Sequence, residues 1–176
     1  MYITNSPEHI EVIGQLYVES FTQGASAQFV DVAELRQYLA EILAVGCAIL
    51  LFEGETLKAC LLYTPLTFDQ YCPETISSNF QAKKCAYIAE IMVAESFRGH
   101  GFGKALLAEF SKTVDTEKYN DVFIRVWDQN TPALQLYEKM GFTKFASIEQ
   151  IKKTPDGKSN FVMNKIYLHK PLSKVV

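Results

Sequence analysis

The chain has 176 residues, 48% of them hydrophobic, so we expect one globular domain over residues 1–176 rather than a disordered chain. The formal net charge of −3, without a basic stripe, argues against a nucleic-acid partner. No apolar run is long enough to span a bilayer and the first residues do not resemble a signal peptide, so we expect no membrane partner. Three of the four cysteines lie in or beside apolar strand-like runs, so we expect them to be reduced, in a cytoplasmic protein.

The first part of the chain predicts a short strand and two helices. The strand covers residues 1–4, and Ser6-Pro7 is a typical helix start, with Ser as the cap and Pro at the first helical position. A small polar stretch at residues 23–28 precedes the capping box Asp31-Val32-Ala33-Glu34, which opens a second helix that ends at Gly46. Apolar residues at helical spacing mark the inner faces: Ile10, Ile13, Tyr17 and Phe21 in the first helix, and Leu35, Leu39, Ile42 and Leu43 in the second.

Two apolar runs at residues 47–52 and 57–63 predict a hairpin of strands. The connection that follows, residues 65–84, is polar, contains Pro73 and has no clean helical or strand period. A connection of this length with little structure of its own is often functional. A mobile, solvated excursion is the alternative interpretation.

A buried strand predicted at residues 86–93 leads into the glycine-rich segment Arg98-Gly99-His100-Gly101-Phe102-Gly103-Lys104, and helical spacing then predicts a helix to about Lys118. A helix start has unpaired N–H groups and partial positive charge. Glycines allow positive φ and a close approach of the backbone to an anion. This strand–loop–helix is therefore predicted to hold a phosphate, with the charges of Arg98 and Lys104 beside it and His100 as a further donor. A tight connection without a ligand is the alternative.

The last part of the chain predicts a strand, a helix and a hairpin. The strand covers residues 121–127, and the helix begins at Thr131-Pro132 and ends at Gly141. Strands at 142–152 and 160–169 then flank a glycine-containing turn. The order is β-α-α-β-β-β-α-β-α-β-β, and its β-α-β crossover requires a parallel pair. We therefore expect an α/β fold with one mixed sheet.

The glycine loop has neither of the common nucleotide fingerprints, because no Gly-Lys-Ser/Thr triplet closes it and its glycines lack the dinucleotide spacing. Arg98, Gly101 and Gly103 instead match Arg-x-x-Gly-x-Gly. Downstream, the chain carries an Asn, an Ala three residues later and then Leu-Tyr-x-x-x-Gly-Phe: Asn130, Ala133, Leu136, Tyr137, Gly141 and Phe142. These two patterns, in this order and at this spacing, resemble the two signatures of the GNAT family of N-acetyltransferases, and the resemblance covers roughly residues 87–142.

The resemblance implies a GNAT-type mixed sheet whose central strands splay apart in a V and bind acetyl-coenzyme A. Backbone N–H groups of the loop would grip its pyrophosphate, and backbone groups of the preceding strand would pair with its pantetheine arm. Asn130 would bond the same arm, cap the helix at Thr131-Pro132, or do both, and the first two helices would border the acceptor site or serve only as core. The implied cofactor-binding residues are Ile91, Met92, Val93, Arg98, Gly99, His100, Gly101, Phe102, Gly103, Lys104, Asn130, Ala133 and Tyr137.

Tyr137 and Glu90 are the candidate catalytic residues. The resemblance places Tyr137 where its hydroxyl, with an ordinary pKa of about 10, would stabilise or protonate the leaving thiolate; a tyrosine packed in the core is the alternative. Glu90 interrupts an apolar strand, on the face of Ile88 and Met92, and burial would raise its pKa toward the range useful for a base. The alternatives are a half-exposed Glu on the sheet and a Glu paired with Arg125.

No metal site is expected, because the four cysteines form no Cys-x-x-Cys pair and the three histidines are scattered. No cysteine lies in either signature, which suits direct attack of the amine in a ternary complex. We expect transfer of an acetyl group from acetyl-coenzyme A to a primary amine; the alternatives are an enzyme for longer acyl chains and a non-catalytic acyl-coenzyme-A sensor.

The acceptor stays open among an antibiotic, a polyamine, an amino acid and a protein N-terminus. Aromatic residues between Phe68 and Phe80 would line the acceptor pocket or pin their own loop. Edge strands of the last hairpin would permit a homodimer.

Overall fold

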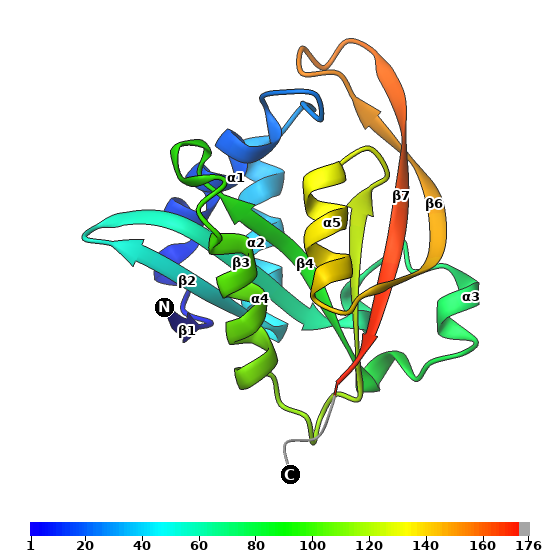
Figure 1. The fold of residues 1–176 in the computed structure, drawn as a ribbon. Helices are drawn as coiled ribbons and strands as arrows, with labels where there is room; N and C mark the ends of the chain where they lie inside the picture. Colours follow the sequence, from blue (N-terminus) through cyan, green and yellow to red (C-terminus); the bar gives the residue numbers. More distant parts are fainter. Residues whose placement is uncertain (173–176) are drawn as a thin grey trace.

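One seven-stranded sheet organises the chain, with strand order β1-β2-β3-β4-β5-β7-β6 (Figure 1). The computed structural model describes residues 1–172. The strands are β1 (Tyr2–Thr4), β2 (Cys47–Glu53), β3 (Thr56–Pro65), β4 (Cys85–Val93), β5 (Asp121–Trp127), β6 (Thr143–Lys153) and β7 (Asn160–Pro171). Neighbouring strands are antiparallel except β4 and β5, which are parallel as the predicted crossover requires. The mixed α/β fold is therefore confirmed.

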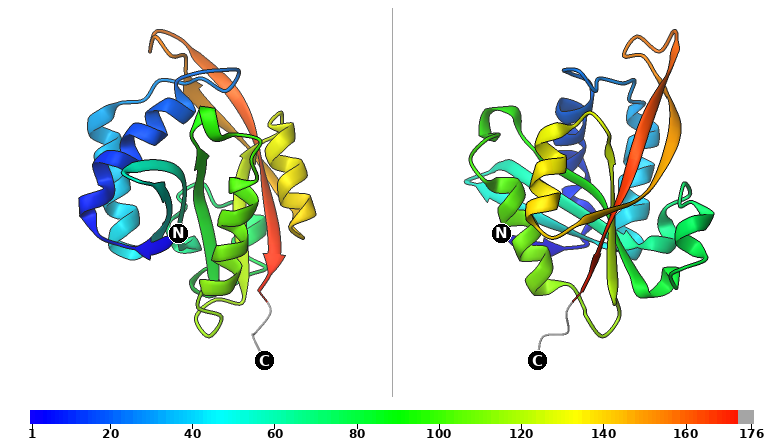
Figure 2. Two further views of the ribbon diagram at one scale, coloured as in Figure 1. Left: turned by 60° about the vertical axis from the view of Figure 1, so that its left-hand side comes forward. Right: turned by 45° about the vertical axis from the view of Figure 1, so that its right-hand side comes forward.

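Helices cover both faces of this sheet (Figure 2). The helices α1 (Ile10–Phe21) and α2 (Val32–Val45) pack on one face, while α4 (Phe102–Thr113) and α5 (Thr131–Lys139) pack on the other. The short α3 (Glu74–Ser77) lies near the sheet edge that holds β6 and β7. Within residues 1–172 no helix has the length and apolar character needed to cross a membrane.

Local sequence signals explain where α2 and α5 begin. The predicted cap at Ser6 is wrong, because Ser6 makes no side-chain capping hydrogen bond and Pro7 opens a 3-10 turn, Pro7–His9, ahead of α1. The Asp31 carboxylate accepts hydrogen bonds from the N–H groups of Ala33 and Glu34, at 2.8 and 3.1 Å, as the capping pattern predicts. Asn130 caps α5 in the same way, accepting from the Ala133 N–H at 3.3 Å. The capping interpretation of Asn130 is therefore confirmed.

The predicted end of α4 at Lys118 is wrong, because the helix stops at Thr113. Val114 is extended, and the Asp115 carboxylate accepts from two later N–H groups, at 3.0 and 3.1 Å, in a separate turn. An aspartate that bonds its own downstream backbone competes with helix continuation.

The segment between β3 and β4 is more ordered than its composition suggests. It contains α3 and two 3-10 turns, Leu66–Phe68 and Ala82–Lys84. Leu66 and Ile76 are buried in one apolar cluster with residues of β4, β5 and β7. The prediction of little structure was therefore wrong, because distant apolar contacts rather than a local period hold this segment.

Candidate active site

The two central strands of the sheet separate halfway along their length. β4 and β5 pair only between Cys85–Ile88 and Asp121–Ile124. Beyond those residues the strands diverge, as the expected V-shaped splay requires. A pocket of about 130 Å³ lies there, with side chains from both strands, α1, α5 and the β6–β7 hairpin. Its lining includes Tyr17, Gln28, Glu90, Ile91, Arg125, Asn130, Tyr137, Gln150, Lys152 and Lys165.

A β-bulge in β4 decides where Glu90 points. Ile88 and Glu90 pair with consecutive residues of β3, so Ala89 is an extra residue in the ladder. The bulge shifts the alternation of side chains: Ile88 packs with the α4 and α5 residues, whereas Met92 packs with α1 and α2. Glu90 therefore shares a face with Met92, as predicted, but the predicted common face with Ile88 is wrong.

Glu90 lies partly buried in the pocket and is held from α2. The Tyr38 hydroxyl donates a hydrogen bond of 3.0 Å to its Oε1. Burial raises the pKa of Glu90 above its ordinary value, and the Tyr38 hydrogen bond and the charges of Lys165, Lys152 and Arg125 oppose that rise. A carboxyl group with a raised pKa is a stronger base than an exposed one.

Arg125 does not pair with Glu90, so that alternative for Glu90 is wrong. Its Nη1 donates to Asp69 Oδ1 at 2.9 Å and to the Tyr167 hydroxyl at 2.9 Å. The Tyr167 hydroxyl in turn donates to Asp69 Oδ2 at 2.6 Å. Asp69 belongs to the segment between β3 and β4, which this network fixes beside the pocket.

The aromatic residues of the same segment pin it to the protein. The Phe80 ring packs against Phe123 and His169, and the Phe68 ring packs against Tyr38. Neither Phe68 nor Phe80 is among the residues that line the pocket.

Tyr137 projects from α5 into the pocket with only 6% of its surface exposed. Its hydroxyl has no hydrogen-bond partner in the part of the chain that the structure describes, unlike the hydroxyls of Tyr38 and Tyr167. Burial, reinforced by the charge of Glu90, raises the pKa of Tyr137 well above its ordinary value. The group therefore stays protonated and is free to donate to a ligand.

The loop between β4 and α4 presents unpaired backbone donors. Gly99 and Gly101 have φ of 80° and 81°, a left-handed conformation that suits glycine, and a Cβ on either would face open space. Gly101 caps α4, and across residues 1–172 no acceptor reaches the N–H groups of Gly99 to Lys104. This open turn is suited to an anion.

Other members of the loop have structural tasks. A Cβ on Gly103 would lie 3.0 Å from Leu136 Cδ2, so this glycine lets α4 pack against α5. Arg98 donates from Nε to the Val93 carbonyl at 3.1 Å, and its N–H donates to the Glu95 carbonyl at 3.2 Å. His100 Nδ1 lies 2.9 Å from the Arg98 carbonyl. The Lys104 side chain is exposed.

The backbone of β4 alternates between β3 and the splay. Just beyond the end of β4, the Ala94 N–H donates to the Lys58 carbonyl of β3. Because successive residues of a strand direct their backbone groups to opposite sides, those of Val93 and Ile91 point into the splay and those of Met92 point to β3. The Val93 carbonyl, which accepts from Arg98, agrees with this alternation.

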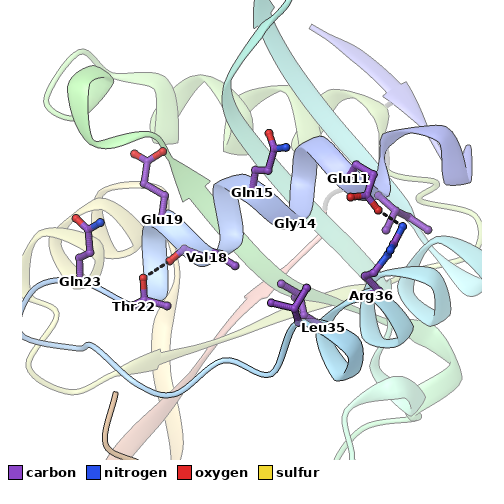
Figure 3. A pocket seen from close by; sticks show the side chains of 11 residues that line it. Glu11, Gly14, Gln15, Val18, Glu19, Thr22, Gln23, Leu35 and Arg36 are labelled. Carbon is purple, nitrogen blue, oxygen red and sulfur yellow. Dashed lines mark hydrogen bonds and ion pairs between the residues drawn. The ribbon is translucent and has the colours of Figure 1, made fainter. Parts of the chain in front are cut away.

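A larger hollow of about 420 Å³ lies elsewhere, between α1 and α2 (Figure 3). Its walls include Gly14, Val18 and Leu35, and Glu11 and Arg36 form an ion pair across one end. Neither the glycine loop nor the splayed strands β4 and β5 contribute to its lining. Within residues 1–172 no group of three or more His, Cys, Asp or Glu is arranged to hold a metal ion.

Comparison with known proteins agrees with this geometry. The model of the Acetyltransferase (GNAT) family matches residues 10–142, well over half of the chain. The chain belongs to the GNAT family. Over 65 residues this GNAT protein is 42% identical to an N-acetyltransferase 9-like protein of Nematostella vectensis, a match that covers 36% of this chain and 33% of that one. The chain thus matches about a third of that relative's length.

Solved structures share the fold over nearly the whole chain. A ribosomal-protein-alanine N-acetyltransferase from Brucella melitensis superimposes with a TM-score of 0.71 at 16% identity, covering 98% of this chain and 100% of that one. A putative acetyltransferase from Salmonella typhimurium with its cofactor acetyl-CoA gives a TM-score of 0.71 at 14% identity, covering 100% and 96%. At these identities the similarity shows the GNAT fold.

Three pocket features were missed at the level of sequence: the contact of Tyr38 with Glu90, and the presence of Lys152 and Lys165. Tyr38 is three residues after Leu35 and four before Ile42 on the inner face of α2, so helical spacing contained a signal for it. The two lysines lie on a hairpin far along the chain, and only the sheet brings them to the pocket.

Proposed function

We propose that this GNAT protein transfers an acetyl group from acetyl-coenzyme A to a primary amine by direct attack in a ternary complex. The observation that carries the proposal is the junction of three features at one place: the splay of β4 and β5, the donor-rich loop, and a pocket lined by both Glu90 and Tyr137. A thioester held along the splay would have its reactive carbon beside that pocket.

Backbone groups would bind the cofactor. The free N–H groups of Gly99 to Lys104 would hold the pyrophosphate, and Lys104 would add positive charge. We assign the pantetheine contacts to Ile91 and Val93, because the backbone of Met92 is directed to β3. Arg98 would have to release the Val93 carbonyl, and would then be free to reach a phosphate.

Glu90 would act as the base. An amine must lose a proton to attack the thioester, and a carboxylate whose pKa is raised by burial accepts it more readily, directly or through water. The new N–C bond forms as the C–S bond breaks, which leaves a thiolate on coenzyme A. The Tyr137 hydroxyl would donate a hydrogen bond to that thiolate, since its raised pKa keeps the proton on oxygen.

Calorimetric titration with acetyl-coenzyme A tests the cofactor site. Wild type is expected to bind, and Gly101→Glu to lose binding, because the substitution puts bulk and negative charge in the anion cradle. Gly54→Glu is the matched control: Gly54 also has a positive φ, 59°, and open space around it, but lies in the β2–β3 turn. Failure of folded wild type to bind would overturn the proposal.

Turnover is tested next with Tyr137→Phe. We expect kcat to fall about 10²-fold or more, the usual contribution of one proton-handling group, with acetyl-coenzyme-A binding retained. Binding without acetylation of any amine by wild type would favour the non-catalytic sensor.

A further inference from the structure

Two lysines of the β6–β7 hairpin, the last hairpin of the sheet, line the proposed acceptor pocket. Lys152 lies on β6 and Lys165 on β7. Gln150 and Met163, which are paired across the two strands, lie between them and also line the pocket. Strand alternation therefore puts all four side chains on one face, toward Glu90.

Neither ammonium group has a hydrogen bond or ion pair with any residue from 1 to 172. The third cation of the pocket, Arg125, is already paired with Asp69. Burial and the nearby Lys152 lower the pKa of Lys165 to about 8, and burial also lowers the pKa of Lys152. The charge of Glu90 attracts both ammonium groups and compensates part of their mutual repulsion, but neither forms an ion pair with it. One carboxylate facing two partly buried cations leaves a net positive site that a second, ligand-borne carboxylate would compensate.

We propose that the acceptor is a small primary amine that also carries a carboxylate, which Lys152 and Lys165 hold while Glu90 faces the amine. This inference rests on the proposed acetyl transfer. A carboxylate accepts strong, charge-assisted hydrogen bonds from ammonium groups. The chain's net charge of −3 would by itself favour a cationic acceptor. The lysines at the pocket have the larger effect on the acceptor, because exposed charges more than about 8 Å apart are largely screened at physiological salt.

The pocket's walls argue for a small acceptor. Its volume of about 130 Å³ is below the range of roughly 300–1,000 Å³ that is typical for drug-sized ligands. The α1–α2 connection also closes over it: Ser26 and Gln28 line the pocket, and the Phe29 N–H donates to the Lys153 carbonyl of β6 at 3.0 Å. An amino acid suits this space better than an antibiotic, and a polyamine would bring a second ammonium against the lysines.

Matched amines test the inference. γ-Aminobutyrate and propylamine differ only by a carboxylate, as do β-alanine and ethylamine, and 1,3-diaminopropane carries a second cation instead. We expect kcat/KM to favour the carboxylated member of each pair by about 10- to 100-fold, the range for one or two charge-assisted hydrogen bonds. Equal or better use of propylamine or 1,3-diaminopropane would overturn the inference.

Substitutions assign that preference to the lysines. Lys152→Met and Lys165→Met remove the charge but keep a side chain of similar length. Each should reduce the ratio of kcat/KM for the carboxylated amine to kcat/KM for its uncharged-tail partner. In the double variant this ratio should be near one. Lys→Arg at either position should restore it, and Lys144→Met, exposed on the same strand β6, should leave it at the wild-type value. An unchanged ratio in the double variant would overturn the inference.

A binding measurement separates this inference from the proposed catalysis. The complex with coenzyme A is titrated calorimetrically with γ-aminobutyrate and with propylamine. Heat from γ-aminobutyrate alone, lost in the double variant, supports the inference even if no amine is acetylated, in which case only the catalytic proposal fails. Equal heats, or none from γ-aminobutyrate, count against the carboxylate site.

Discussion

The Tyr38 hydroxyl and the Glu90 carboxylate, 52 positions apart in the chain, form a hydrogen bond of 3.0 Å that ties α2 to the splayed strand β4. The bond stabilises the charged form of Glu90 and so opposes the effect of burial on its pKa. Tyr38 therefore positions the proposed base and adjusts its proton affinity without facing the cofactor loop.

Tyr38→Phe should raise the pKa of Glu90 further, because a hydrogen bond that favours the carboxylate is lost while the burial and the charges of Lys152, Lys165 and Arg125 remain. The acid limb of the pH profile of kcat/KM should therefore move to higher pH. Tyr71→Phe, on an exposed side chain, is the control. An acid limb at the wild-type pH would show that the ionisation of Glu90 does not cause it.

Glu90→Gln should change how stability depends on pH. In the wild type the folded pKa of Glu90 is above the unfolded one, so the folded state binds the proton more tightly and loses stability as pH rises through the folded pKa. Gln keeps the acceptor for Tyr38 but does not titrate. The difference in Tm, variant minus wild type, should grow from about pH 4 upward, and parallel Tm curves would contradict this.

Replacement by alanine should change the free energy of unfolding in opposite directions at Gly46 and at Gly14. A Cβ on Gly46 would lie 2.0 Å from the Tyr63 carbonyl oxygen, a backbone atom that no rotamer change can move. Gly46→Ala should cost about 1–3 kcal/mol or more. Gly14 lies inside α1, where a Cβ would meet Leu39 Cδ1 at an ordinary 3.7 Å, so Gly14→Ala should stabilise by about 0.5–1 kcal/mol. Urea unfolding measures both changes, and the same sign for the two would refute this reasoning.

Asp69→Ala should destabilise the protein by about 3 kcal/mol, because it leaves the guanidinium of Arg125 and the hydroxyl of Tyr167 without their shared partner. The Arg125 side chain is 15% exposed, so water compensates part of the loss and the lower end of the usual range applies. Glu74→Ala, exposed in the same segment, serves as the control. Thermal and urea unfolding should agree, and equal stability of the two variants would argue against a structural role for the network.

Local signals in the sequence were sufficient for most of the elements. The helix caps at Asp31 and Asn130 and the glycine turn before α4 depend on contacts within a few residues. They can therefore be predicted from the local sequence. Two of the errors have different causes. α4 ends at Thr113 instead of the predicted Lys118 because the Asp115 carboxylate bonds its own downstream backbone, a local signal that competes with the helical spacing. Residues 65–84, which are predicted to have little structure, are ordered because Leu66 and Ile76 are buried against strands from later in the chain.

The sequence by itself determined the order of the strands and of the longer helices, though not α3, and it determined the parallel pair and the donor-rich loop, because each depends on periodicity or on backbone chemistry over a short stretch. Only the tertiary structure decided the chemistry of the pocket. The bulge at Ala89 turns Glu90 to the side of α1 and α2, and the hairpin brings Lys152 and Lys165 to the same cavity. Register and bulges arise from pairing between distant strands, which side-chain periodicity along one strand does not encode.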